Sequence, residues 1–170
     1  YCERERNIEV RVMAVANKSK AKGTRAEAAA VKLLTQLTGW NWERIPLSGA
    51  LDAKHGLKGD VYIPKELNKY CVEIKHYKDD HLTSKMLTGK TPQIQEWWEQ
   101  TTREQKENEA EHPLLIFKFD RSKWFCAFQE EPINDYRHFY YSEGFYLAKL
   151  EDYLTDREKG EWVWQRVLRK

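Results

Sequence analysis

Residues 70–75, YCVEIK, form an apolar run that carries two charged residues. A strand that is apolar on both faces is typical of a sheet covered from both sides, whereas a half-solvated strand alternates apolar and polar residues. Alternate side chains of a strand share a face, so Glu73 and Lys75 project to the same side. The sequence therefore predicts a covered strand on which an acid and a lysine lie together, where charged residues are uncommon.

A second acid-bearing run, GDVYI at 59–63, precedes this strand, and the stretch between them predicts a hairpin. If the two strands pair, Asp60 falls beside Glu73 and two carboxylates converge near Lys75. Mg²⁺ is held by one or two carboxylates, a carbonyl and several waters, so this is the required type of ligand. A neighbouring lysine suits a phosphodiester substrate, because its ammonium group can orient an attacking water and stabilise negative charge.

A simpler interpretation is an ordinary ion pair between Glu73 and Lys75 on a solvated face of the sheet, with Asp60 ending a turn after Gly59. Acids and lysines are common and the pattern is short, so a lone D…E-x-K favours this interpretation. The apolar surroundings of the pair favour the functional one.

The bulk properties of the chain limit the classes of function. Its 170 residues suit one domain with a core of its own, and a net charge of +2 means that any nucleic-acid surface has to be local. Three scattered cysteines fit neither a disulfide framework nor a zinc ribbon, which indicates a reducing environment. No apolar run reaches the length that a membrane span needs. We expect a cytoplasmic protein with no membrane contact and no small-molecule cofactor.

We expect an α/β fold with a mixed central β-sheet flanked by helices. Helices are expected from Thr24 to about residue 38 and from Thr91 to about Asn108. Further strands are expected at WNWERI, LLIFKF, WFCAF and GFYLAKL. We divide the chain into a basic N-terminal segment at 1–22 that is an arm or an irregular helix, a core at 23–130 and an extension at 131–170 that packs on the core or forms a dimer interface.

Glu27 is a third candidate carboxylate, with two interpretations that the spacing does not separate. It shares a helical stripe with Ala30, Val31 and Leu34, so it points toward the core. The segment TRAE is equally a capping box, in which Thr24 caps the helix and Glu27 reaches back to the Thr24 amide.

The histidines and tryptophans near the acid pair are of types that can bind metals or stack on bases, but their spacing supports neither role as well as the acid pattern supports a metal site. His55, His76 and His81 share no spacing on a helix or strand, so we predict solvated or phosphate-contacting histidines and no zinc site. Trp97 and Trp98 could stack on bases, but aromatic residues on a short amphipathic helix more often pack against a sheet, and we expect at least one in the core.

Basic residues gather at the start of the first predicted helix, where Lys18, Lys20 and Lys22 lie close to Arg25 in the sequence. They are either solvated charges or contacts to backbone phosphates, and we predict the latter for Lys22 and Arg25.

These motifs occur in an order that resembles the archaeal-type Holliday junction resolvases, a branch of the PD-(D/E)XK nuclease superfamily. The segments that carry the resemblance, between residues 22 and 128, are KGTRAE, RIPLSG, GDVYI, CVEIK, KDDHL and LLIFKF with WFCAF. The resemblance implies a restriction-endonuclease-like core with Glu27, Asp60 and Glu73 as metal-coordinating acids and Lys75 as the catalytic lysine. It implies Mg²⁺ as the cofactor, with Mn²⁺ as a substitute.

The same resemblance implies contacts to DNA from the segment between Arg44 and Ser48, and from Gln93 at the start of the following helix. We expect a homodimer that acts in DNA recombination and repair by paired nicks in four-way junctions. Resolution of a junction needs two incisions and the domain has a single acid cluster. Two apolar patches are candidate dimer surfaces, WFCAF and the aromatic-rich segment from Tyr136 to Tyr146.

Two alternatives stay open. The protein is either another endonuclease of the superfamily, restriction-like or active in repair, or a module that binds branched DNA without cutting it. The sequence also departs from the family pattern, because the loop at 50–59 is longer and the segment beyond residue 130 has no counterpart in its compact members.

Overall fold

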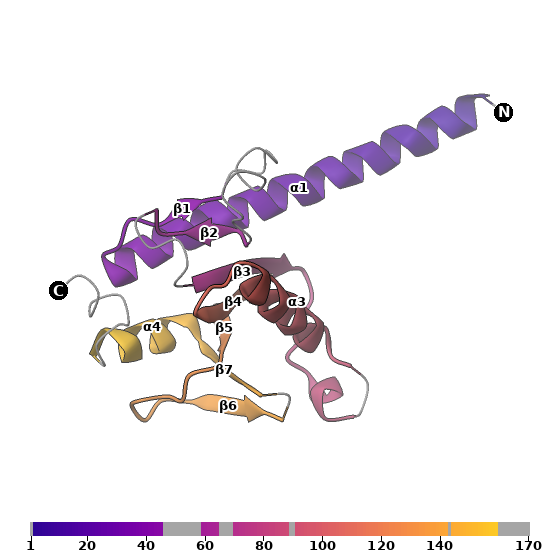
Figure 1. Ribbon diagram of the computed structural model, residues 1–170. Coiled ribbons are helices and arrows are strands. Elements are labelled where there is room, and N and C mark those ends of the chain that lie inside the picture. The colour runs from indigo at the N-terminus through magenta and orange to yellow at the C-terminus, as the bar shows by residue number, and fades with distance from the viewer. Residues whose placement is uncertain (1, 46–58, 65–69, 89–90, 143, 160–170) are drawn as a thin grey trace.

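The computed structural model describes residues 2–45, 59–64, 70–88, 91–142 and 144–159 of the chain. These residues form an α/β fold around one mixed sheet (Figure 1). In chain order the elements are α1 (Cys2–Thr38), β1 (Glu43–Arg44), β2 (Val61–Tyr62), β3 (Tyr70–Tyr77), the 3₁₀ helix η1 (Ser84–Leu87), α3 (Gln93–Glu107), β4 (His112–Phe119), β5 (Trp124–Phe128), β6 (His138–Tyr141), β7 (Phe145–Lys149) and α4 (Leu150–Lys159).

The sheet has the strand order β1-β2-β3-β4-β5-β7-β6. Strands β3 and β4 are parallel over their whole length, and every other neighbouring pair is antiparallel. A parallel pair needs a crossover connection, and here α3 provides it. The mixed sheet flanked by helices confirms the predicted fold class.

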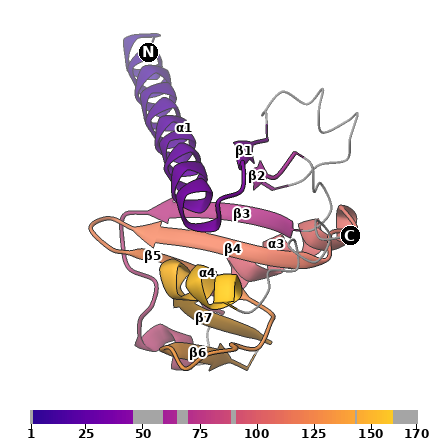
Figure 2. The same cartoon turned by 90° about the vertical axis from the view of Figure 1, so that its left-hand side faces the viewer.

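Helices cover both faces of the sheet, which explains why β3 is apolar on both sides. On one face α1 and α4 pack against it, with Ala30 of α1 and Tyr153 of α4 fully buried. On the other face α3 inserts Ile94, Trp97 and Trp98. Figure 2 shows α1 and α4 on the opposite side of the central strands from α3.

Helix α1 differs from its prediction, because it begins at Cys2 rather than near Thr24. The segment predicted as an arm or an irregular helix at 1–22 is, over its described residues, helix, and its N-terminal half extends away from the sheet (Figure 1). Gly23 lies inside the helix with no atom near a Cβ built there, and the strong helix formers around it offset its roughly 1 kcal/mol of unfavourable propensity.

In the part of the chain that the structure describes, neither α1 nor any other helix is both long and apolar enough to cross a membrane.

The chain beyond residue 130 contributes β6, β7 and α4 to the same sheet and core. The strand predicted at GFYLAKL is β7, and it inserts between β5 and β6. Strand β5, the WFCAF patch, consequently lies inside the sheet with Cys126, Ala127 and Phe128 buried. The prediction that WFCAF forms a dimer surface is therefore wrong.

Candidate active site

Strand β2 places Asp60 directly opposite Glu73. The antiparallel register pairs Val61 with Val72, and the Asp60 amide donates to the Val72 carbonyl at 2.8 Å. The Asp60 carboxylate then accepts a hydrogen bond of 2.6 Å from the backbone amide of Ile74. The hairpin predicted from sequence therefore brings the two acids together as expected.

Gly59 makes this approach possible. Its φ of +92° lies in the region that favours glycine, and a Cβ built there would be 2.7 Å from the Val72 carbonyl oxygen. Only a residue without a side chain lets β2 meet β3 at this point, one residue before Asp60.

Glu73 and Lys75 form an ion pair on the face of the sheet that α3 covers. The Lys75 ammonium lies 2.9 Å from the Glu73 carboxylate, and Glu73 is 7% exposed. The solvated ion pair considered from the sequence is therefore excluded, because the pair lies between the sheet and a helix.

Gln100 of α3 holds both members of this pair. Its side-chain oxygen accepts from Lys75 at 3.0 Å, and its amide donates to Glu73 at 3.1 Å and to Glu104 at 3.0 Å. Gln100 was not among the site residues predicted from the sequence. The available signal was helical spacing, because Gln100 lies one turn after the buried Trp97.

Gln93, predicted to contact DNA, is the first residue of α3. Its amide donates to Glu96 at the start of α3. Gln100 lies seven residues later, about 10 Å along the helix, and is the glutamine that contacts Glu73 and Lys75.

Burial dominates the electrostatics of the two acids. Desolvation raises the pKa of Glu73, the charge of Asp60 raises it further, and Lys75 opposes both. Desolvation likewise raises the pKa of Asp60, against the Ile74 hydrogen bond that lowers it. Two buried carboxylates that lie side by side need compensating positive charge to be ionised together.

Glu27 lies on α1, on the other side of the sheet, and forms an ion pair with Arg44 of β1 at 2.7 Å. Its charge is near enough to raise the pKa of Asp60. The capping-box interpretation is wrong, because Thr24 lies in the middle of α1. Glu27, a predicted metal ligand, and Arg44, a predicted DNA contact, are thus paired with each other.

The other predicted DNA contacts are dispersed. Lys22 contacts Asp120 at 3.0 Å, and the same carboxylate lies 2.9 Å from His76. Arg25 is exposed on α1. Ser48 lies outside the described residues, as does His55.

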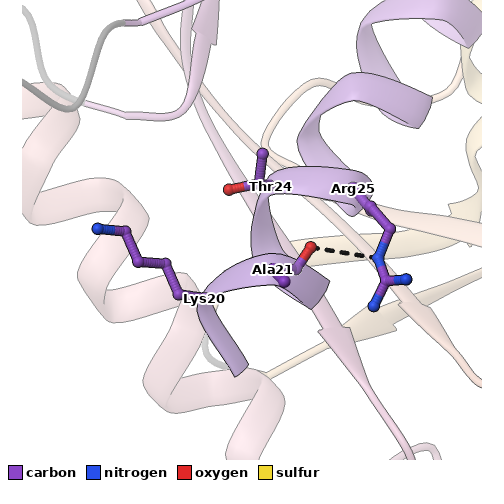
Figure 3. A pocket seen from close by; sticks show the side chains of 4 residues that line it. All are labelled: Lys20, Ala21, Thr24 and Arg25. Atoms are coloured by element: carbon purple, nitrogen blue, oxygen red, sulfur yellow. Dashed lines mark hydrogen bonds between the residues drawn. The ribbon is translucent and has the colours of Figure 1, made fainter. Parts of the chain in front are cut away.

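An open hollow of about 480 Å³ lies along α1, lined by Lys20, Ala21, Thr24 and Arg25 (Figure 3). The Arg25 side chain donates to the Ala21 carbonyl across one helical turn. The lining residues come from one helix and include no acid, so this hollow is separate from the acid pair. It is a basic surface with two exposed cations, Lys20 and Arg25.

Within the described ranges, no group of three acidic, histidine or cysteine side chains is placed to hold a metal ion. Asp60 and Glu73 nevertheless supply the two carboxylates that a hard cation takes in sites completed by carbonyls and waters. Cys71, next to them on β3, is unsuited, because burial raises the pKa of its thiol to about 12. The donor set fits a divalent ion of the Mg²⁺ type.

Trp97 and Trp98 belong to the core, with 3% and 4% exposure, so the prediction that at least one of them packs against the sheet is confirmed. His81 packs edge-on against Trp97 and Phe119.

A mixed sheet in which an acid-bearing strand pairs with a Glu-x-Lys strand, between helices on both faces, defines the core of the PD-(D/E)XK nucleases. The chain belongs to the family described as "Phage putative PDDEXK endonuclease", whose model matches residues 18–159. It is 42% identical over 112 residues to Protein D14 of Escherichia phage T5, an alignment that covers 64% of this chain and 69% of that protein. No solved structure matches the chain. Family membership indicates a nuclease, a class that generally uses divalent metal ions.

Proposed function

We propose that this protein is a Mg²⁺-dependent endonuclease that acts on branched DNA, with the four-way junction as its substrate. The observation that carries the proposal is the convergence of Asp60, Glu73 and Lys75 at the junction of β2 and β3, where Gln100 fixes the pair. The order of motifs that resembles the junction resolvases supports the choice of substrate.

Each residue of the site has a distinct task in phosphodiester hydrolysis. Asp60 and Glu73 would hold the metal ion, which would supply a lowered pKa of bound water and positive charge beside the phosphate. The Lys75 ammonium orients the attacking water and stabilises the negative charge that develops on the phosphate oxygens. Gln100 keeps this ammonium beside Glu73 rather than in solvent.

The distribution of surface charge determines from which side DNA can approach this site. The outward side of α3 carries exposed acids, Glu96, Glu99 and Glu107, which repel phosphates. Exposed cations lie on α1, at Lys18, Lys20 and Arg25. We assign the phosphate contacts to this helix, and to Arg44 when it is released from Glu27.

The test is cleavage of a four-way junction, a flap and a linear duplex of matched sequence by the purified protein in Mg²⁺, in Mn²⁺ and in EDTA. We expect cutting of the junction with either ion and none in EDTA. Asp60→Asn, Glu73→Gln and Lys75→Ala should abolish cleavage while DNA binding persists, because phosphate contacts elsewhere hold the DNA.

The matched controls are Glu107→Gln and Lys123→Ala, exposed residues that should cut like the wild type. Junction binding without cutting in either metal would leave only a binding module, and equal cutting of duplex and junction would leave a nuclease without preference for branches.

Glu27 needs its own comparison, since its partner Arg44 gives it a structural role as well. If Glu27 is a metal ligand, Glu27→Gln abolishes cleavage at an unchanged melting temperature, whereas Arg44→Gln weakens DNA binding only. If the ion pair is purely structural, the two variants show the same small loss of stability, about 1 kcal/mol or less for a partly exposed pair, and normal cleavage.

A further inference from the structure

Tyr77 is an exposed aromatic residue on the strand that carries the site. It ends β3, and by strand alternation it lies on the same face as Glu73 and Lys75. Its exposure is 43%, in contrast to the buried tryptophans of α3. Part of its ring surface is therefore available to another molecule.

The ring is held in place by its neighbours. It stacks on Trp97 with centroids 4.8 Å apart and an interplanar angle of 28°, and His81 meets it edge-on at 5.8 Å. The turn that carries His81 is itself fixed, because the Asp80 carboxylate accepts from the Leu82 amide at 2.7 Å. An aromatic surface fixed in advance loses little conformational entropy when something stacks on it.

Two elements connect this ring rigidly to the site. Along β3, Tyr77 is two residues beyond Lys75, about 7 Å at the usual rise of a strand. Along α3, its support Trp97 is one turn from Gln100, which holds Lys75. The ring is thus about 7 Å along the strand from Lys75 and, four residues from Glu73, roughly 13 Å from a phosphodiester bound at the acid pair.

We propose that the exposed face of Tyr77 stacks on an unpaired nucleobase close to the scissile phosphodiester, on the Lys75 side of the acid pair. This inference rests on the proposed function and deepens it. Every base has a flat face, so stacking on an aromatic ring tolerates any sequence. In a duplex both faces of a base are covered by its neighbours. Tyr77 therefore favours DNA with an unstacked base near the cut, as at the centre of a junction or the base of a flap.

The competing role for Tyr77 is to cover Trp97 from solvent. The two roles differ in what they require, because any apolar side chain covers Trp97 but only an aromatic ring stacks. Tyr77→Phe retains both functions and Tyr77→Leu retains only the cover.

The experiment measures binding in a Glu73→Gln background, which prevents cutting, with a flap whose branch-point base is 2-aminopurine and with a matched duplex. We expect Tyr77→Leu to weaken flap binding by about fivefold or more and to abolish the quenching of 2-aminopurine, with duplex binding unchanged. Tyr77→Phe should bind within about twofold of the parent. Equal flap binding and quenching in Tyr77→Leu would overturn the inference.

A change on the DNA side tests the same contact without dependence on the folding of a variant. An abasic site at the branch point should weaken binding of the Tyr77 protein by the same factor, and should cause no further loss in Tyr77→Leu. An abasic flap that the Tyr77 protein binds as tightly as the intact flap contradicts stacking.

The failure of this inference can be told apart from failure of the proposed function. A wild-type protein that neither binds nor cuts any DNA overturns both. A wild-type protein that cuts junctions, together with a Tyr77→Leu variant that binds and cuts them equally well, overturns only the role of Tyr77.

Discussion

Gln100 is the residue that holds the ion pair between Glu73 and Lys75 in one geometry. A lysine next to a glutamate on a strand has free rotamers, and side-chain entropy opposes holding it in one geometry. The Gln100 amide accepts from Lys75 and donates to Glu73, so both groups are fixed from α3. The third hydrogen bond, to Glu104, fixes the amide itself.

We predict that Gln100→Leu lowers the cleavage rate by about 10- to 100-fold, the usual effect of removing a residue that orients a metal-site ligand. Donation from Gln100 favours the ionised form of Glu73, so its removal raises the Glu73 pKa. The acidic limb of the rate–pH profile should therefore move to higher pH.

The control is Gln95→Leu, since Gln95 lies on the same helix and contacts Glu99 instead. A lower melting temperature with an unmoved pH profile would show that Gln100 has only a packing role.

At the scale of elements, the contact between β2 and β3 decides whether the acids meet. Strand β2 is two residues long, and it is kept in register by the hydrogen bonds at Asp60, by its pairing with β1 and by the buried side chains of Val61 and Ile63. Gly59 is the position at which this contact is tightest.

We predict that Gly59→Ala lowers the free energy of unfolding by more than the roughly 1–2 kcal/mol that a left-handed backbone conformation costs an alanine. The added Cβ also meets the Val72 carbonyl, which increases the loss. Cleavage should fall with it, as Asp60 moves away from Glu73. Gly39→Ala is the matched control, with φ of +72° and no atom near its Cβ, and it should lose stability without a loss of activity per folded molecule. Chemical denaturation and single-turnover rates measure the two effects, and equal outcomes for both variants would contradict this account.

At the scale of the whole molecule, the sheet formed by the described residues ends at β6, and this edge strand is poorly protected. Strand β6 pairs with β7 on one side, and Phe139 and Tyr140 are 68% and 63% exposed. Edge strands usually carry lysine, proline or a bulge that blocks further pairing, and the sequence HFYY has neither residue. A second copy pairing there would form an isologous interface.

We predict a homodimer through β6, with two sites that nick opposed strands of a junction. Phe139→Glu should shift sedimentation at micromolar protein from dimer to monomer, because it places charge on the shared edge. On a cruciform-bearing plasmid, the wild type should yield linear product and the variant nicked circles. A wild-type protein that sediments as a monomer with and without junction DNA would remove the dimer and leave a nuclease with single incisions.

The sequence by itself determined the acid pair and the lysine, because strand alternation and hairpin pairing are local rules. The period of two placed Glu73 and Lys75 on one face, and the short connection brought Asp60 opposite. The tertiary structure alone decided which helical residues join them. Whether Gln100 or Gln93 reaches the lysine depends on how α3 docks over β3, and whether Glu27 meets metal or Arg44 depends on how α1 crosses the other face. Those contacts join elements far apart in the chain: helical spacing places Gln100 on the inward side of α3, but no local period specifies which residues of β3 it meets.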